Sequence, residues 1–238
     1  MRQLRSYICI LFLLLVMTGC GDQKPVGSTN SDAENGTIPL TYEPVKVDKQ
    51  VMPLKKEDIQ KIVKEVQVDQ VKVIAFTKPN ESDILLFGGI QIGTNLYEIG
   101  DIGAPVYSDQ LQVKTSSLFK QSVIDIGGLC GANCSFQYYL TINNNVPSIF
   151  LYLNSPPSIV NLDQDGIEAI ITSYGSPNAY ETVIYTIQNN QLVSVNLNKA
   201  LNARSVLYTD PTFVVQMTDN APPQEYKYTK NGLVLLQK

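Results

Sequence analysis

Four pairs of β-type runs, each folded around a short polar turn, constrain this chain more than any other feature. The turns cover residues 93–95, 143–145, 188–190 and 230–232, and the flanking runs are rich in Val, Ile, Tyr, Phe and Thr. β-Branched and aromatic residues favour strands, while Asn and Gly accept the positive φ angles of tight hairpin turns. The sequence therefore predicts a mainly β fold made of repeated antiparallel hairpins.

The spacing of these hairpins indicates a repeat. Their turn centres lie near residues 94, 144, 190 and 231, which is about 40 to 50 residues from one to the next. Propeller blades recur at this interval. A meander with evenly placed hairpins, as in many sandwiches and barrels, has the same pattern. We expect an all-β domain over 51–238 that is a partial or small β-propeller-like structure, with such a meander as the alternative.

The N-terminal segment has the organisation of a secretory signal. Arg2 and Arg5 precede an apolar run over 7–17, which is too short to span a bilayer. The following Met17-Thr18-Gly19-Cys20 resembles the lipobox of bacterial lipoproteins, with Met where Leu is usual. The resemblance implies removal of 1–19 and acylation of Cys20, which would anchor the chain to the extracytoplasmic face of a bacterial membrane. An ordinary secretory signal that ends near a Cys is the alternative.

The charge of the chain argues against a nucleic-acid partner. The formal net charge is −4, and it becomes −6 once the two Arg residues of the signal are removed. The remaining sequence contains no basic cluster that could neutralise phosphates. The expected partners are therefore the lipid bilayer, through Cys20, and an unidentified protein or polysaccharide.

Two further segments precede the β-rich part. Residues 20–50 are polar and scattered with Gly, Pro, Ser and Asn, which predicts a flexible linker whose later part, from Ile38, lies extended against the domain. Residues 54–66 place apolar side chains at helical spacing, with lysines on the opposite face. This pattern predicts one short helix at the start of the domain.

An acidic turn carries the best candidate for a metal site. Side-chain oxygens stand at alternate positions, Gly166 allows a sharp turn, and an apolar strand-like run follows. A calcium ion takes six to eight oxygen ligands, which such a loop supplies from its first, third, fifth and seventh positions. The candidate ligands are the side chains of Asn161, Asp163 and Asp165, the carbonyl of Ile167, and the adjacent Glu168. Thr172 stands where an EF-hand needs a bidentate Glu, so the loop is not an EF-hand.

The same residues resemble the Asp-x-Asp/Asn-x-Asp-Gly turns of FG-GAP/VCBS repeats, which occur in integrin-like β-propellers and many bacterial surface proteins. The resemblance implies a calcium-binding loop that leads into a blade strand, here Ile170-Ile171. The family usually closes its site with an acid where this chain has Ala169, and Glu168 would point to the other side of an extended strand. A turn stabilised by Asn and Asp without any metal is the alternative.

Cys130 and Cys134 are the two cysteines left after processing, and they lie in a Gly-rich loop. On the oxidising side of a membrane we expect them to form a disulfide. A thiol–disulfide role is the alternative, although the pair has one intervening residue more than the C-x-x-C of thioredoxin-like proteins. A zinc site is not expected, because the sequence contains no His to complete it.

The absence of His also removes Ser-His-Asp and Cys-His catalysis. We therefore expect a membrane-anchored binding or scaffolding module, stabilised by calcium at the 161–168 loop, rather than an enzyme. The alternative from another class is an envelope hydrolase that uses carboxylates such as Asp163 and Asp165, or Glu81 and Asp83.

Overall fold

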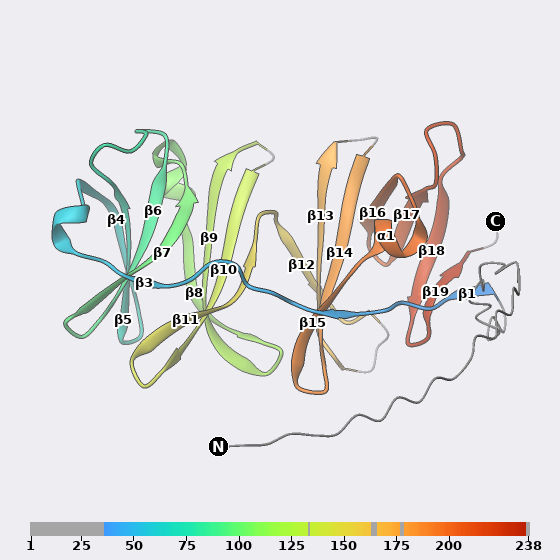
Figure 1. Ribbon diagram of the computed structural model, residues 1–238, viewed down its shortest axis with the longest axis horizontal. Helices are drawn as coiled ribbons and strands as arrows, with labels where there is room; N and C mark the ends of the chain where they lie inside the picture. Colours follow the sequence, from blue (N-terminus) through green and yellow to red (C-terminus); the bar gives the residue numbers. More distant parts are fainter. Residues whose placement is uncertain (1–35, 133, 163–165, 177–178, 237–238) are drawn as a thin grey trace, which may run out of the picture. The chain divides into compact units, whose positions relative to one another are not determined.

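The strands form four antiparallel sheets that follow one another along the chain (Figure 1). The computed structural model describes residues 36–132, 134–162, 166–176 and 179–236. Sheet I contains β4 (Lys61–Val68), β5 (Val71–Thr77), β6 (Leu86–Ile92) and β7 (Asn95–Gly103), and sheet II contains β8 (Gln112–Leu118), β9 (Gln121–Gly131), β10 (Cys134–Asn143) and β11 (Val146–Leu153). Sheet III contains β12 (Pro157–Val160), β13 (Ala169–Ser176), β14 (Ala179–Gln188) and β15 (Gln191–Asn196), and sheet IV contains β16 (Ser205–Thr209), β17 (Thr212–Gln216), β18 (Gln224–Thr229) and β19 (Gly232–Leu235).

The four predicted hairpins are confirmed, and each joins the third and fourth strands of one sheet. The turn residues explain two of them directly. Asn144 and Asn145 have φ angles of 53° and 62°, and Asn189 and Asn190 have φ angles of 51° and 61°. Two consecutive positive φ angles produce a two-residue turn whose twist matches that of the flanking strands. The mainly β class is confirmed, and the described residues form no closed barrel or propeller.

Apolar clusters join each sheet to the next. Sheets I and II pack through residues such as Ile90 and Ile126, and sheets III and IV pack through residues such as Ile184 and Phe213, all fully buried. Sheets II and III meet in a smaller cluster of buried residues, to which sheet III contributes Ile170. The smaller contact leaves room for a groove between the two sheets.

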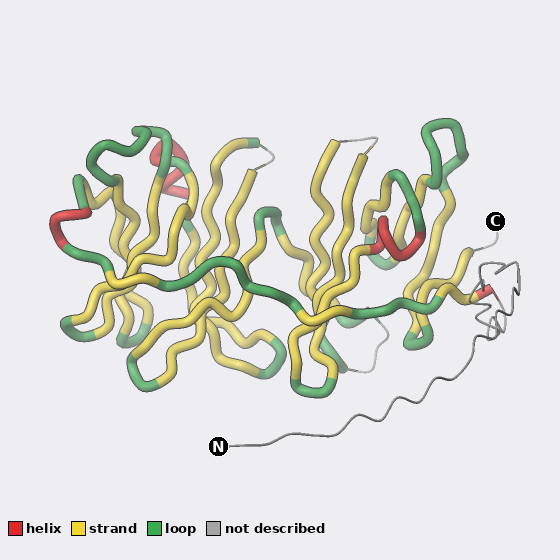
Figure 2. Tube along the Cα trace, viewed as in Figure 1, coloured by secondary structure: helices red, strands yellow, loops and turns green. Residues whose placement is uncertain are grey.

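An extended N-terminal segment adds strands to three of the sheets. We call this segment the strap; it contains β1 (Thr37–Ile38), β2 (Glu43–Pro44) and β3 (Met52–Pro53). These pair with β19, β15 and β7, so the strap meets the sheets in the reverse of their chain order. Figure 2 shows it as a mostly irregular tube interrupted by short strand pieces. Pairing of the strap with the sheets therefore begins at Thr37. This lies within the predicted linker, ahead of residue 51, where we expected the domain to begin.

The predicted helix over 54–66 is wrong. A 3-10 turn occupies Lys56–Asp58, and β4 begins at Lys61. The helical spacing of the apolar residues was outweighed by a ladder with β5, in which Val66 is opposite Val73 and Val68 is opposite Val71, with one register shift between Ile62 and Lys64. β-Branched side chains suit this paired, half-buried position, and local propensity yields to tertiary packing.

Two further helical segments are short. A 3-10 turn, Pro105–Gln110, connects sheet I to sheet II, and α1 (Leu197–Leu201) connects sheet III to sheet IV. Among the described residues no helix is long and apolar enough to cross a membrane. The predicted signal segment 1–19 and the acylation site Cys20 lie outside the described residues.

Candidate functional site

The groove between sheets II and III is the candidate site. Directly opposite residues of an antiparallel pair share a face, and the face of sheet II towards sheet III changes character along its strands. Tyr139, in the apolar contact with sheet III, is opposite Asp125, and Asp125 is opposite Lys114. Farther from the contact, Gln137 is opposite Gly127, and the disulfide hairpin follows. The face therefore passes from apolar to charged to small and neutral.

The outer part of the groove is a cleft of about 620 Å³, which we call the tyrosine cleft. Its walls come from the 3-10 turn Pro105–Gln110, the β9–β10 hairpin, the link before β12, and the ends of β13 and β14. Tyr107, Tyr174 and Tyr180 line it together with several Ser and Gly residues. None of the described residues that line it is an Asp, Glu, Lys or Arg. Tyr and Ser offer rigid contact area and adaptable hydrogen bonds, the combination common in protein recognition surfaces.

Two buried hydroxyls in the lining have no hydrogen-bond partner. Ser135 is 8% exposed and Ser155 is 3% exposed, and neither Oγ contacts a donor or acceptor among the described residues. A buried polar group without a partner costs about 1–3 kcal/mol. A hydroxyl can rotate to suit a new partner, so a polar group placed in the cleft would recover part of this cost.

The inner part of the groove is a second cleft of about 360 Å³, which we call the Asp125 cleft. It shares Gln110, Leu129, Ser135 and Pro156 with the tyrosine cleft, so the two adjoin. Asp125 is 6% exposed; its Oδ1 accepts a hydrogen bond from Gln137 Nε2, and its Oδ2 lies 3.5 Å from Lys114 Nζ. Burial raises the pKa of the Asp125 carboxyl, and the ammonium of Lys114 opposes that rise only in part.

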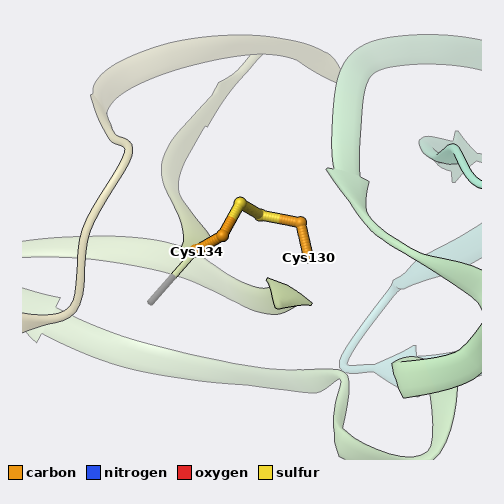
Figure 3. The surroundings of a disulfide bond; sticks show 2 residues. All are labelled: Cys130 and Cys134. Carbon is orange, nitrogen blue, oxygen red and sulfur yellow. A yellow bond between two sulfur atoms is a disulfide. The ribbon is translucent and has the colours of Figure 1, made fainter. Parts of the chain in front are cut away.

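A disulfide closes the hairpin beside the tyrosine cleft. Cys130 near the end of β9 and Cys134 at the start of β10 are joined as predicted, with their Cα atoms 5.0 Å apart (Figure 3). Cys134 and its neighbour Gly131 line the cleft. The bond therefore restrains one wall of the cleft, which is the loop-shaping role expected of so small a ring.

Lys64 holds another wall in place. Its Nζ donates to the carbonyls of Ser108, Asp109 and Leu111, at 3.1, 3.2 and 3.2 Å. These carbonyls belong to the end of the 3-10 turn that carries Tyr107 and Gln110 into the cleft. A lysine suits this position because the last carbonyls of a helical turn lack partners and carry partial negative charge.

The structure describes only part of the predicted calcium loop. Asp163 and Asp165 lie outside the described residues. Asn161 is exposed, and Gly166 takes the turn expected of it, with a φ of 82°. Ile167 is also exposed. Among the described residues no group of three or more His, Cys, Asp or Glu side chains could hold a metal ion.

The predicted ligand Glu168 contacts a different sheet. Its Oε2 accepts a hydrogen bond from the backbone N–H of Phe119 at 2.6 Å. Phe119 lies in the turn between β8 and β9, so one carboxylate oxygen of Glu168 is engaged with sheet II.

Comparisons with known proteins gave no relative: no family model, no curated protein and no solved structure matches this chain. The candidate site is therefore inferred from the geometry of this structure. The sequence predicted the disulfide, but it did not single out Asp125, Lys64, Ser135 or Ser155, because the burial and pairing that distinguish them arise between distant segments. The run of Ser, Tyr and Gly over 173–176 was the one local signal that could have indicated the cleft.

Proposed function

We propose that the protein is a lipid-anchored module on the extracytoplasmic face of a bacterial membrane, and that it binds a protein or polysaccharide partner in the tyrosine cleft. The lipobox-like Met17–Cys20 segment supports the anchor. The disulfide supports an oxidising compartment. The binding role is carried by one observation about the tyrosine cleft: its described lining includes three tyrosines and no charged side chain, and two buried hydroxyls there lack hydrogen-bond partners.

We also propose that the four sheets are blades of a small, propeller-like array. Each is a four-stranded antiparallel meander, and the array has the repeat spacing of blades. In this arrangement the strap would act as a shared outer strand, since it pairs with the fourth strand of sheets I, III and IV. Such an array is a rigid frame that carries binding surfaces between its blades.

Two experiments test the anchor and the binding role separately. Cys20→Ser should move the protein from the membrane fraction to the soluble fraction, whereas Cys9→Ser should not.

For binding, a photo-crosslinking amino acid is placed at Ser176, which lines the cleft, or at exposed Asn231 in the β18–β19 turn of sheet IV. Cross-links in intact cells that form from position 176 and not from position 231 support the proposal. Equal or absent cross-linking at the two positions would contradict it.

A carboxylate-based hydrolase is the second candidate, and the buried Asp125 with its raised pKa favours it. Glycosidases need two carboxylates across the scissile bond. Asp125 is the single carboxylate among the described residues that line either cleft. If the protein cleaves a labelled cell-wall polymer and Asp125→Asn abolishes the cleavage without unfolding, this candidate replaces the binding module.

A further inference from the structure

One edge of β13 faces the tyrosine cleft. Ser173, Tyr174, Gly175 and Ser176 are consecutive in this strand, and all four line the cleft. Side chains of successive strand residues point to opposite faces of a sheet. Four consecutive lining residues therefore show that the cleft lies beside the strand and in line with its backbone, not over one face of the sheet.

The edge is open because β12 is too short to cover it. β12 has four residues and β13 has eight, and the ladder between them runs from Val160–Ala169 to Pro157–Thr172. Just ahead of Pro157, Ser155 and Pro156 form no ladder with β13, and they line the same cleft. Among the described residues no strand pairs with Ser173–Ser176 on this side. The cleft occupies the place where β12 would continue.

The open edge lacks the features that usually protect such edges. Proteins guard exposed edges with charged side chains, Pro or bulges. Residues 173–176 contain no charge and no Pro, and their ladder with β14 has no register shift. Gly175 departs from regular strand geometry, with a φ of 130°, while Tyr174 is 37% exposed. Every second residue of such an edge presents an N–H and a C=O that need a partner. An unprotected strand edge inside a cleft is suited to binding an added strand, and the residues that line the cleft select which strand can enter.

We propose that an extended, uncharged peptide segment binds in the tyrosine cleft as an added strand, beside Ser173–Ser176 and in the direction of β12. Backbone groups that recur every two residues, about 6.8 Å apart, match another extended backbone. The described lining residues offer no charge to balance a charged side chain, and Ser135 and Ser155 supply hydroxyls for the polar groups of the peptide. This inference rests on the proposed binding role and names the ligand class.

The test uses the full chain, purified in detergent, and a phage-displayed library of random octapeptides. Enriched peptides are resynthesised with N-methyl groups on alternate amides, in both possible registers, because N-methylation removes the donors of one peptide edge. We expect the peptides that are N-methylated in one register to bind about tenfold or more weakly, and those that are N-methylated in the other register to bind nearly as well as the unmodified peptide. Tyr174→Ala should weaken binding, and Tyr97→Ala, a strand tyrosine outside both clefts, should not. Peptide binding should slow hydrogen exchange at alternate amides of 173–176.

Three results would overturn the inference. These are a library without enrichment, peptides that tolerate N-methylation in both registers, and binding of neutral oligosaccharides from an array in place of peptides. The first and third leave the binding role standing if cross-links still form from position 176. If no cross-links form from position 176, no peptide is enriched from the library and no oligosaccharide on the array binds, the proposed binding function itself is wrong.

Discussion

The carboxylate of Glu168 accepts a hydrogen bond from the backbone N–H of Phe119, with 2.6 Å between Oε2 and N. The bond joins the segment that leads into β13 of sheet III to the β8–β9 turn of sheet II. That turn is unusual, because Phe119 and Lys120 have φ angles of 51° and 64°. L-residues with bulky side chains pay a steric cost in this conformation, so an added acceptor for the turn N–H helps to maintain it.

We predict that Glu168→Ala lowers the free energy of unfolding by about 1.5–3 kcal/mol, the usual net contribution of a hydrogen bond to a charged group. Urea denaturation measures this loss. Glu57→Ala, at an exposed position in the Lys56–Asp58 turn, should have almost no effect. A Glu168 variant as stable as the parent protein would show that the contact with Phe119 contributes nothing.

Replacing Lys64 should weaken the wall of the tyrosine cleft. Lys64→Met keeps the aliphatic stem but removes the Nζ donor from the carbonyls of Ser108, Asp109 and Leu111. The Ser108 carbonyl still accepts from the Leu111 N–H. The expected loss of stability is about 1–3 kcal/mol, with faster hydrogen exchange in the Pro105–Gln110 turn. Lys61→Met on the same strand is the control, since Lys61 is exposed. Equal effects of the two substitutions would refute the role of Lys64.

Asp125 should make stability depend on pH. Burial raises its pKa above 3.8 in the folded protein, so the folded state binds the proton more tightly than the unfolded state. The resulting stabilisation is complete below about pH 3.8, the ordinary pKa, and is lost as the pH rises through the higher pKa of the folded state. The free energy of unfolding of the parent protein should therefore fall relative to that of Asp125→Asn over this range. Parallel pH profiles of the two proteins would contradict the shift.

The disulfide should shape the hairpin more than it holds the fold. A ring closed between residues four apart contributes about 2 kcal/mol in the chain-entropy model. The double substitution Cys130→Ser, Cys134→Ser should cost no more than this and should preserve cooperative unfolding. Reduction of the disulfide in the parent protein should give the same midpoint of urea denaturation as the double substitution. A redox role would require that dithiothreitol reduces the bond readily in the folded protein, which mass spectrometry can measure.

We propose that calcium binds the 161–168 loop, and this predicts a higher melting temperature. Calcium at ten times its dissociation constant stabilises by about 1.4 kcal/mol, which raises Tm by about 3–5 °C for a chain of this size. About 10 mM calcium is required if the site is as weak as those of extracellular modules. Asp163→Asn should abolish the rise, and Asp83→Asn, at an exposed turn position outside this loop, should preserve it. If adding EDTA leaves Tm unchanged, the loop is a turn that binds no calcium.

The sequence predicted the repeated hairpins because their turns are encoded locally. Asn144-Asn145 and Asn189-Asn190 favour positive φ whatever surrounds them. The first hairpin of each sheet was harder to see. The β8–β9 turn contains Phe119 and Lys120, which have no preference for positive φ, and β4 carries a pattern that also suits a helix. In both cases the decisive contacts come from outside the segment.

The sequence by itself determined the class of the fold, the periodic hairpins and the Cys130–Cys134 pair, since each depends on residues close together in the chain. The tertiary structure decided the site. Lys64 meets carbonyls 44 to 47 residues away, Glu168 meets Phe119 across 49 residues, and Asp125 is buried only where sheets II and III approach each other. The open edge of β13 likewise exists only because its ladder with β12 ends at Thr172. These relationships depend on which sheet surfaces pack together, and packing between distant segments leaves no periodic trace in the sequence.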